Sequence, residues 1–149
     1  MANKIEQWIP KLATDWNTKF EKLDDGITWA IDVPFKLNSD GFRYQWVYLS
    51  YGVGVAKGND IYDVRSKVGD YSSGVDLHGL LQEAKYGFYS AICIRELNRD
   101  GNQVEVVFVQ ASPLAEHVNT YEQFKFIIEE VGSTADILED KFYGGIDKT

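Results

Sequence analysis

Cysteine is almost absent from this sequence. Cys93 is the single cysteine among 149 residues, which excludes an intramolecular disulfide. It stands between Ile92 and Ile94, where a thiol is expected to be buried as a small hydrophobic side chain and not to act as a nucleophile. A chain without structural disulfides fits a reducing compartment, so we expect a cytoplasmic protein.

Long apolar runs are also missing. No window approaches the roughly 18 apolar residues of a membrane-spanning helix, and no continuous apolar stretch follows a basic region at the N-terminus. We therefore expect a protein that is neither exported nor anchored, with no membrane partner.

Positive charge is scarce. The chain has 15 Lys and Arg residues against 23 Asp and Glu residues, for a formal net charge of −8. Such a chain repels phosphate backbones, and no basic run with interleaved aromatic residues offers a local exception. We predict no nucleic-acid partner and consider a basic protein or peptide a better one.

Groups for catalysis and metal binding are few. The two histidines, His78 and His117, have no metal-ligand spacing to each other or to Cys93. The glycines at 52, 54 and 58 lack the Lys and Ser or Thr of a phosphate-binding loop. We predict no catalytic residue, no metal site and no cofactor, although an enzyme pocket assembled from distant residues stays open as an alternative.

Aromatic residues, in contrast, are abundant. The sequence has 4 Trp, 9 Tyr and 8 Phe, and 44% of its residues are hydrophobic. A chain of this length and composition can bury a core of its own. We predict one folded domain over residues 1–149.

Three segments have helical periodicity. Apolar residues recur at steps of three and four over residues 4–22, near 76–86 and over 120–142. Pro10 places the start of the first regular helix near Ile9, because a proline is tolerated in the first turn. Asp76 is a candidate N-cap, and Thr120 with Gln123 has the spacing of a capping box.

Five segments have the pattern of strands. They cover residues 27–37, 42–49, 61–68, 89–97 and 103–111. Asn38 to Gly41 predicts a hairpin link, and the Asp100-Gly101 pair predicts a tight hairpin turn. The order α-β-β-β-α-β-β-α predicts an α+β fold with an antiparallel five-stranded sheet and helices packed on it.

The second predicted strand is apolar on both faces. Period two places Phe42, Tyr44, Trp46 and Tyr48 on one face. The opposite face carries Val47, Leu49, Tyr51, Val53 and Val55. Helices on one side of a sheet cannot cover both faces, which predicts a homodimer or a protein partner. The residues we assign to protein binding are Tyr44, Trp46, Tyr48, Leu49 and Tyr51.

The pattern resembles a known superfamily. The strand Val104-Glu105-Val106-Val107-Phe108-Val109 leads into a helix with Phe124, Ile127, Ile128, Val131, Ala135, Asp136 and Leu138. In a small acidic chain this order resembles the fold shared by class I type III secretion chaperones and the YbjN-like family. The resemblance implies a dimeric protein-binding module. Chaperones of that kind wrap an extended partner segment around hydrophobic patches on their sheets, whereas the YbjN-like branch has been called a sensory-transduction regulator and has no assigned chemistry.

These observations favour a noncatalytic protein-binding module, chaperone-like or regulatory. The alternative is an acidic inhibitor or immunity protein that neutralises a basic partner through complementary charge.

Overall fold

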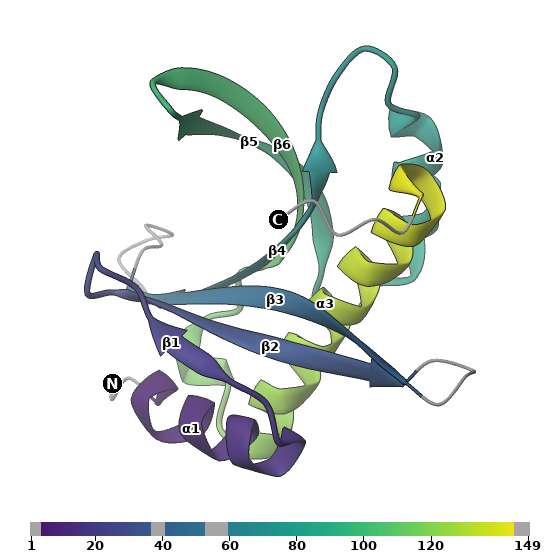
Figure 1. Ribbon diagram of the computed structural model, residues 1–149. Coiled ribbons are helices and arrows are strands. Elements are labelled where there is room, and N and C mark those ends of the chain that lie inside the picture. Colours follow the sequence, from purple (N-terminus) through teal and green to yellow (C-terminus); the bar gives the residue numbers. More distant parts are fainter. Residues whose placement is uncertain (1–3, 37–40, 53–59, 145–149) are drawn as a thin grey trace.

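The computed structural model describes residues 4–36, 41–52 and 60–144. It is an α+β fold in which helices pack on one antiparallel sheet (Figure 1). The helices are α1 (Ile5–Trp16), α2 (Leu77–Glu83) and α3 (Tyr121–Tyr143), with 3-10 turns η2 (Ala84–Tyr86) and η3 (Ala115–His117). The strands are β1 (Phe20–Lys22), β2 (Thr28–Lys36), β3 (Phe42–Tyr51), β4 (Tyr62–Asp70), β5 (Ala91–Arg99) and β6 (Asn102–Ala111).

In the described ranges, the sheet has six strands in the order β1-β2-β3-β4-β6-β5, and each neighbouring pair is antiparallel. The α+β class is confirmed, but the prediction of five strands is wrong. The missed strand is β1, whose Phe20 pairs with Ile31 of β2. Phe20 continues the three-and-four spacing of the first helix, so periodicity alone assigned this short strand to the helix.

The first helix also differs from its predicted range. It begins at Ile5 and ends at Trp16, because Asn17 adopts a left-handed conformation with φ 50° and closes the C-terminus. Pro10 lies inside the helix instead of in its first turn. An interior proline costs about 3 kcal/mol, whereas burial of an apolar side chain such as Ile5 or Leu12 gives about 2 kcal/mol. Several such side chains are fully buried on this helix, so packing outweighs the proline.

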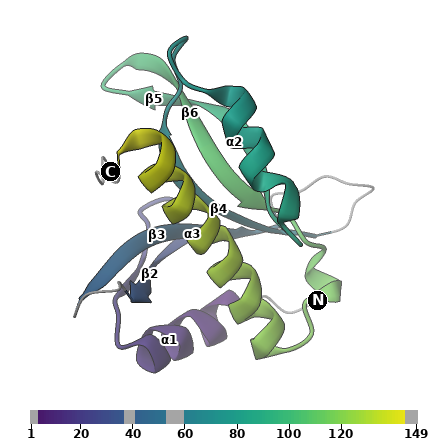
Figure 2. The same cartoon turned by 90° about the vertical axis from the view of Figure 1, so that its right-hand side faces the viewer.

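Helix α3 is the central helix of the fold. It crosses β4, β3 and β6, while α1 packs on β2 and against α3 (Figures 1 and 2). Its N-terminus has the predicted capping box, with the Gln123 backbone N–H donating to Thr120 Oγ1 at 3.1 Å and the Gln123 side chain accepting from the Thr120 N–H. Gly132 brings the helix close to the sheet, because a Cβ there would lie 3.2 Å from Val47 Cγ2.

One apolar core lies between the helices and the sheet. Its largest fully buried side chains include Ile5, Ile9, Leu12, Ile31, Leu49, Tyr62, Leu80, Ile128 and Leu138. Within the described residues, no buried side-chain nitrogen or oxygen lacks a hydrogen-bond partner. None of the helices in the described ranges is long and apolar enough to cross a membrane.

Local signals predicted the other caps and turns. The Gly79 N–H donates to the Asp76 side chain at the start of α2. Asp100 and Gly101 have φ 52° and 83°, as a two-residue turn between β5 and β6 requires. β2 and β3 pair from Thr28 with Ser50 to Lys36 with Phe42, but the predicted link residues 38–40, and Val53 and Val55, lie outside the described residues.

Candidate protein-binding site

The sheet has one face that carries no described helix. In Figure 1, β5 and β6 curve over this face, while α1, α2 and α3 lie on the other side. The curvature leaves a cavity of about 560 Å³, which we call the sheet groove. It is lined by Leu23, Gln45, Trp46, Tyr48, Arg65, Lys67, Leu97, Arg99 and Phe108.

The structure divides the five predicted protein-binding residues between the two faces. Trp46 and Tyr48 line the sheet groove, and both are half-buried. Tyr44 lies on the same face but borders a separate hollow with Asp32. Register places the alternate residues of β3 on the helix side of the sheet.

Leu49 and Tyr51 lie on that helix side. Leu49 is fully buried in the core, so its side chain offers no surface to a partner. Tyr51 packs against Tyr62 with ring centroids 5.6 Å apart, and its hydroxyl donates to Asp60. The predicted alternation along β3 is confirmed. It places the five predicted residues on opposite faces of the strand, so they do not form one surface.

The lining of the sheet groove is cationic. Among the residues that the structure describes, it includes Arg65, Lys67 and Arg99 and no Asp or Glu. Arg99 and Lys67 share one carboxylate, that of Asp70, at 2.8 and 3.7 Å. Hydrogen bonding from Arg99, the main cause, holds the pKa of Asp70 below its usual value. Arg99 and Lys67 therefore lie beside the same carboxylate at the edge of the groove, in a chain whose net charge is −8.

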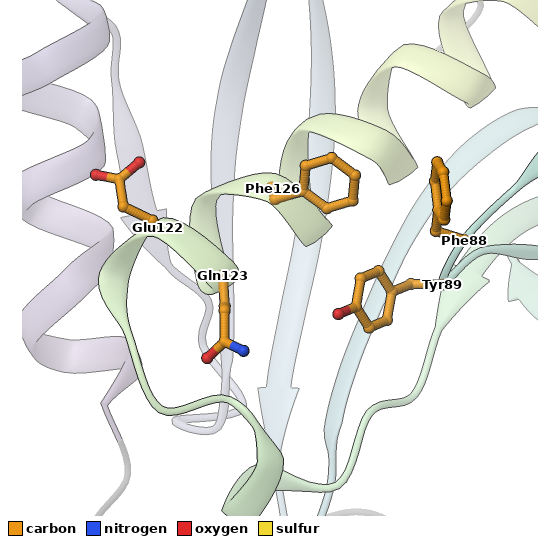
Figure 3. Close-up of a pocket in the computed structure, with 5 residues that line it drawn as sticks. All are labelled: Phe88, Tyr89, Glu122, Gln123 and Phe126. Carbon is orange, nitrogen blue, oxygen red and sulfur yellow. The ribbon is translucent and has the colours of Figure 1, made fainter.

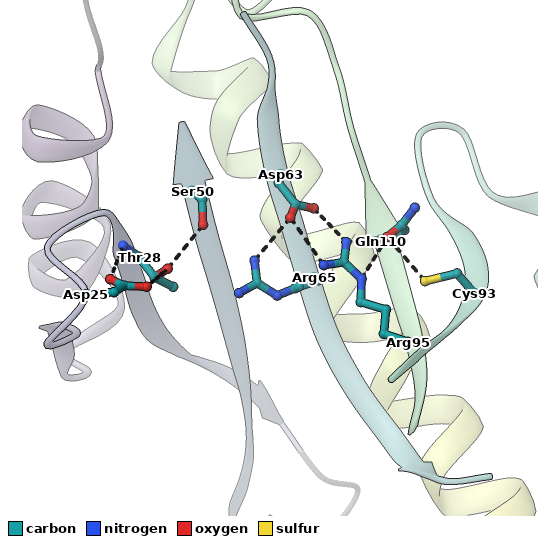
Figure 4. Close-up of polar contacts among 8 residues, drawn as sticks. All are labelled: Asp25, Thr28, Ser50, Asp63, Arg65, Cys93, Arg95 and Gln110. Carbon is teal, nitrogen blue, oxygen red and sulfur yellow. Dashed lines mark hydrogen bonds and ion pairs between the residues drawn. The ribbon is translucent and has the colours of Figure 1, made fainter. Parts of the chain in front are cut away.

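A second shared carboxylate lies deeper on the same face (Figure 4). Asp63 accepts from Arg65 Nη1 at 3.2 Å and from Arg95 Nη2 at 3.0 Å. Burial lowers the pKa of Arg65, against the attraction of Asp63. Burial also opposes the charge of Arg95, but its hydrogen bonds and attraction to Asp63 outweigh that effect and raise its pKa. The network fixes the guanidinium groups in place.

Aromatic rings accompany these cations. The Arg65 guanidinium lies 5.8 Å from the centroid of the Tyr48 ring, and that of Arg95 lies 5.8 Å from the Phe108 ring. Cations over ring faces are attracted by the ring quadrupole. The groove thus combines immobilised cations with partly exposed rings.

Cys93 belongs to the network instead of the core. Its thiol donates to Gln110 Oε1 at 3.2 Å, and Arg95 Nε donates to the same oxygen. The side chain is half-exposed. The prediction of apolar burial between Ile92 and Ile94 is wrong, because alternation places Cys93 on the opposite face of β5 from its neighbours.

At the opposite edge of this face lies the turn between β1 and β2, whose residues Asp25 and Thr28 are drawn in Figure 4. Asp25 accepts from the Thr28 hydroxyl at 2.6 Å and from the backbone N–H groups of Ile27 and Thr28. These bonds, that of the Thr28 side chain first, lower the pKa of Asp25. Thr28 in turn contacts the Ser50 hydroxyl at 3.3 Å. The turn holds Leu23 at the border of the groove.

The histidines lie elsewhere. His78 is exposed on α2, and His117 is exposed on η3 with Nε2 3.8 Å from Glu116. Neither lines the sheet groove. Within the part of the chain that the structure describes, no group of three His, Cys, Asp or Glu side chains is placed to hold a metal ion.

The cationic residues of the groove are not among the predicted site residues. The signal was present as alternation, since Asp63, Arg65 and Lys67 share one face of β4, and Arg95, Leu97 and Arg99 share one face of β5. These residues meet only because β6 lies between β4 and β5. Sequence order does not give that arrangement.

Comparisons with known proteins returned no match to any family model, curated protein or solved structure. The resemblance to secretion chaperones and the YbjN-like family stays a prediction.

Proposed function

We propose that this protein is a noncatalytic protein-binding module whose sheet groove receives an extended segment of another protein. The observation that carries the proposal is the pairing of half-buried rings, Trp46 and Tyr48, with the cations Arg65, Lys67 and Arg99 in one cavity, whose described lining residues include no Asp or Glu. Trp, Tyr and Arg are enriched among the few residues that carry most of the binding energy at protein interfaces.

The charge of the groove predicts the composition of the bound segment. Three cations and five apolar or aromatic side chains favour a segment that alternates acidic and apolar residues. An extended chain places alternate side chains on opposite sides, so one row can contact the rings while carboxylates reach the cations. A segment bound on a sheet is also what the secretion-chaperone resemblance implies.

The test is the binding of labelled model peptides. A peptide that alternates glutamate with leucine is expected to bind, and its lysine counterpart is not. Trp46→Ala should weaken binding by about tenfold, which corresponds to about 1.4 kcal/mol. Phe42→Ala is the matched control, because Phe42 lies on the same face of β3 but outside the groove lining.

The charge contribution is tested separately. Lys67→Gln with Arg99→Gln should weaken binding at low salt and reduce its dependence on salt. Equal binding of both peptides, or binding that Trp46→Ala leaves unchanged, would overturn the proposal.

A homodimer is the form of this proposal in which the partner is a second copy. Size-exclusion chromatography with light scattering distinguishes the two forms. A dimer that persists at high salt and dissociates in Trp46→Ala would place the second copy on the groove. A monomer that binds the acidic peptide would assign the groove to another protein.

The second candidate function, an acidic inhibitor or immunity protein, is favoured by a different surface. Of the described residues, four glutamates and no Lys, Arg or His line two hollows on the helix side of the sheet.

A further inference from the structure

Three aromatic side chains lie together on the helix side of the molecule. Phe88 and Tyr89, from the link before β5, face Phe126 of α3 (Figure 3). Phe88 is 83% exposed, Tyr89 46% and Phe126 47%. Both rings of the link lie 6.0 Å from the Phe126 ring, in edge-to-face arrangements. We call Phe88, Tyr89 and Phe126 the aromatic cluster.

Hydrogen bonds to α3 hold the link that carries Phe88 and Tyr89. Glu130 of α3 accepts hydrogen bonds from the backbone N–H groups of Phe88 and Tyr89 and from the Ser90 hydroxyl. Gly87 permits the tight link, since a Cβ there would lie 2.8 Å from Ser90 Oγ. The backbone that carries two of the rings is therefore held against a long helix. A backbone that is already ordered loses little conformational entropy when a partner binds.

The surroundings of the cluster are acidic. A hollow of about 580 Å³ beside Phe88, Tyr89 and Phe126 is lined by Glu122 and Gln123. An adjoining hollow of about 400 Å³, also bordered by Phe88 and Phe126, is lined by Glu83, Glu129 and Glu130. Within the part of the chain that the structure describes, no Lys, Arg or His lines either hollow.

Two of these carboxylates are already engaged. Glu130 holds the link, and Glu83 is paired with Lys141. Among the described residues, the ion pairs within 4.0 Å include neither Glu122 nor Glu129. Glu122 lies one turn of α3 before Phe126, on the far side of the first hollow from the rings (Figure 3). The surface thus combines exposed rings with two carboxylates that border the hollows.

We propose that this surface binds a basic segment of a partner protein through arginine side chains. A guanidinium stacks on an aromatic face and also pairs with a carboxylate through two N–H groups, whereas the ammonium of lysine is a strongly hydrated point charge. Aromatic rings flanked by glutamates match both properties of arginine. The site lies on the other side of the sheet from the groove and has the opposite charge, so it does not depend on peptide binding in the groove. It rests on the same surface as the second candidate function and specifies the chemistry of the basic partner.

The probe is a labelled peptide that alternates arginine with serine, measured by fluorescence polarisation. Its lysine and citrulline counterparts separate charge from shape, because citrulline keeps the planar group without the charge. We expect the arginine peptide to bind most tightly and the citrulline peptide to show little binding. Phe88→Ala should weaken the binding of the arginine peptide by about tenfold.

The matched controls use residues elsewhere. Phe42→Ala removes an exposed ring on the other face, and Glu21→Gln removes an exposed carboxylate on β1. Both should leave binding unchanged, as should Trp46→Ala in the groove. Glu122→Gln with Glu129→Gln should weaken binding and reduce its salt dependence. Since Phe88 is exposed, its truncation should leave the circular dichroism spectrum and the melting temperature unchanged.

Three results would overturn the proposal. Equal binding of the arginine and lysine peptides would indicate attraction to the net charge alone. Binding that survives Phe88→Ala would place the peptide elsewhere. Self-association that Phe88→Ala abolishes, without peptide binding, would assign the cluster to a second copy of this chain.

Discussion

Arg43 of β3 and Asp136 of α3 form a two-point ion pair that fastens the central helix to the sheet. Arg43 Nε and Nη2 lie 2.8 and 2.7 Å from the two carboxylate oxygens of Asp136. The hydrogen bond to Asp136 raises the pKa of Arg43, against the effect of burial. The Asp136 side chain is only 10% exposed, so water replaces little of this contact once it is broken.

Removal of this carboxylate should destabilise the fold. We expect Asp136→Ala to lower the free energy of unfolding by about 2 kcal/mol, because it leaves a half-buried guanidinium without its main partner. Asp140, 3.6 Å from Arg43, retains part of the interaction. Urea unfolding of Asp136→Ala, Arg43→Met and the double variant measures the coupling, and additive effects of the two single changes would contradict the pair.

The capping box predicts a second stability change. Thr120→Ala removes the acceptor of the Gln123 N–H and should cost about 1 kcal/mol in the free energy of unfolding. Thr120→Ser keeps the hydroxyl and is the matched control, with a much smaller effect. Thermal unfolding of both variants checks this, and similar losses in the two would show that the hydroxyl is not responsible.

The close approach of α3 to the sheet at Gly132 predicts a third stability change. Gly132→Val places a branched side chain where a Cβ alone already lies 3.2 Å from Val47 and 3.4 Å from Phe35. We expect a loss of about 2 kcal/mol from overpacking. Ser133→Val, one residue further and half-exposed, is the control. Comparable stability of the two variants, measured by urea unfolding, would be inconsistent with the tight contact.

The Asp70 ion pairs predict a pH dependence. Because Arg99 lowers the pKa of Asp70 from its usual value of 3.8, the carboxylate stabilises the native state at pH values above 3.8. That contribution is lost as the pH falls through the lowered pKa of the folded state. Asp70→Asn should therefore be less stable than the wild type at neutral pH, and the difference should shrink in acid.

Urea unfolding of both proteins over a pH series measures this difference. Arg99→Gln is the companion variant and should reduce the same pH dependence. A difference that stays constant from neutral pH to strongly acidic pH would contradict the role of the carboxylate.

Local chemistry made much of the fold predictable. Asp76, Thr120 and the Asp100-Gly101 pair each act through hydrogen bonds or dihedral angles within a few residues, and all three are confirmed. The bounds of α1 were less predictable. Its end at Asn17 is a left-handed cap at a non-glycine residue, and Phe20 continues the helical spacing into a strand.

The candidate site was predictable only in part. Alternation in β3 correctly separated Tyr44, Trp46 and Tyr48 from Leu49 and Tyr51. It did not say which set the helices cover, because a period of two is the same for both faces. No pattern in the sequence predicts the aromatic cluster, since Phe88 and Phe126 lie far apart along the chain. They meet because Glu130 of α3 binds the backbone of the link at Tyr89.

The sequence by itself determined the α+β class, the positions of most helices and strands, the caps and turns, and which residues share a face. These properties depend on backbone preferences and periodicity over a few residues. The tertiary structure alone decided that α3 covers the Leu49 face, that β6 brings Arg99 beside Lys67, and that the groove is cationic while the aromatic cluster is acidic. Such features arise from packing between distant segments, whose free energy no local pattern encodes.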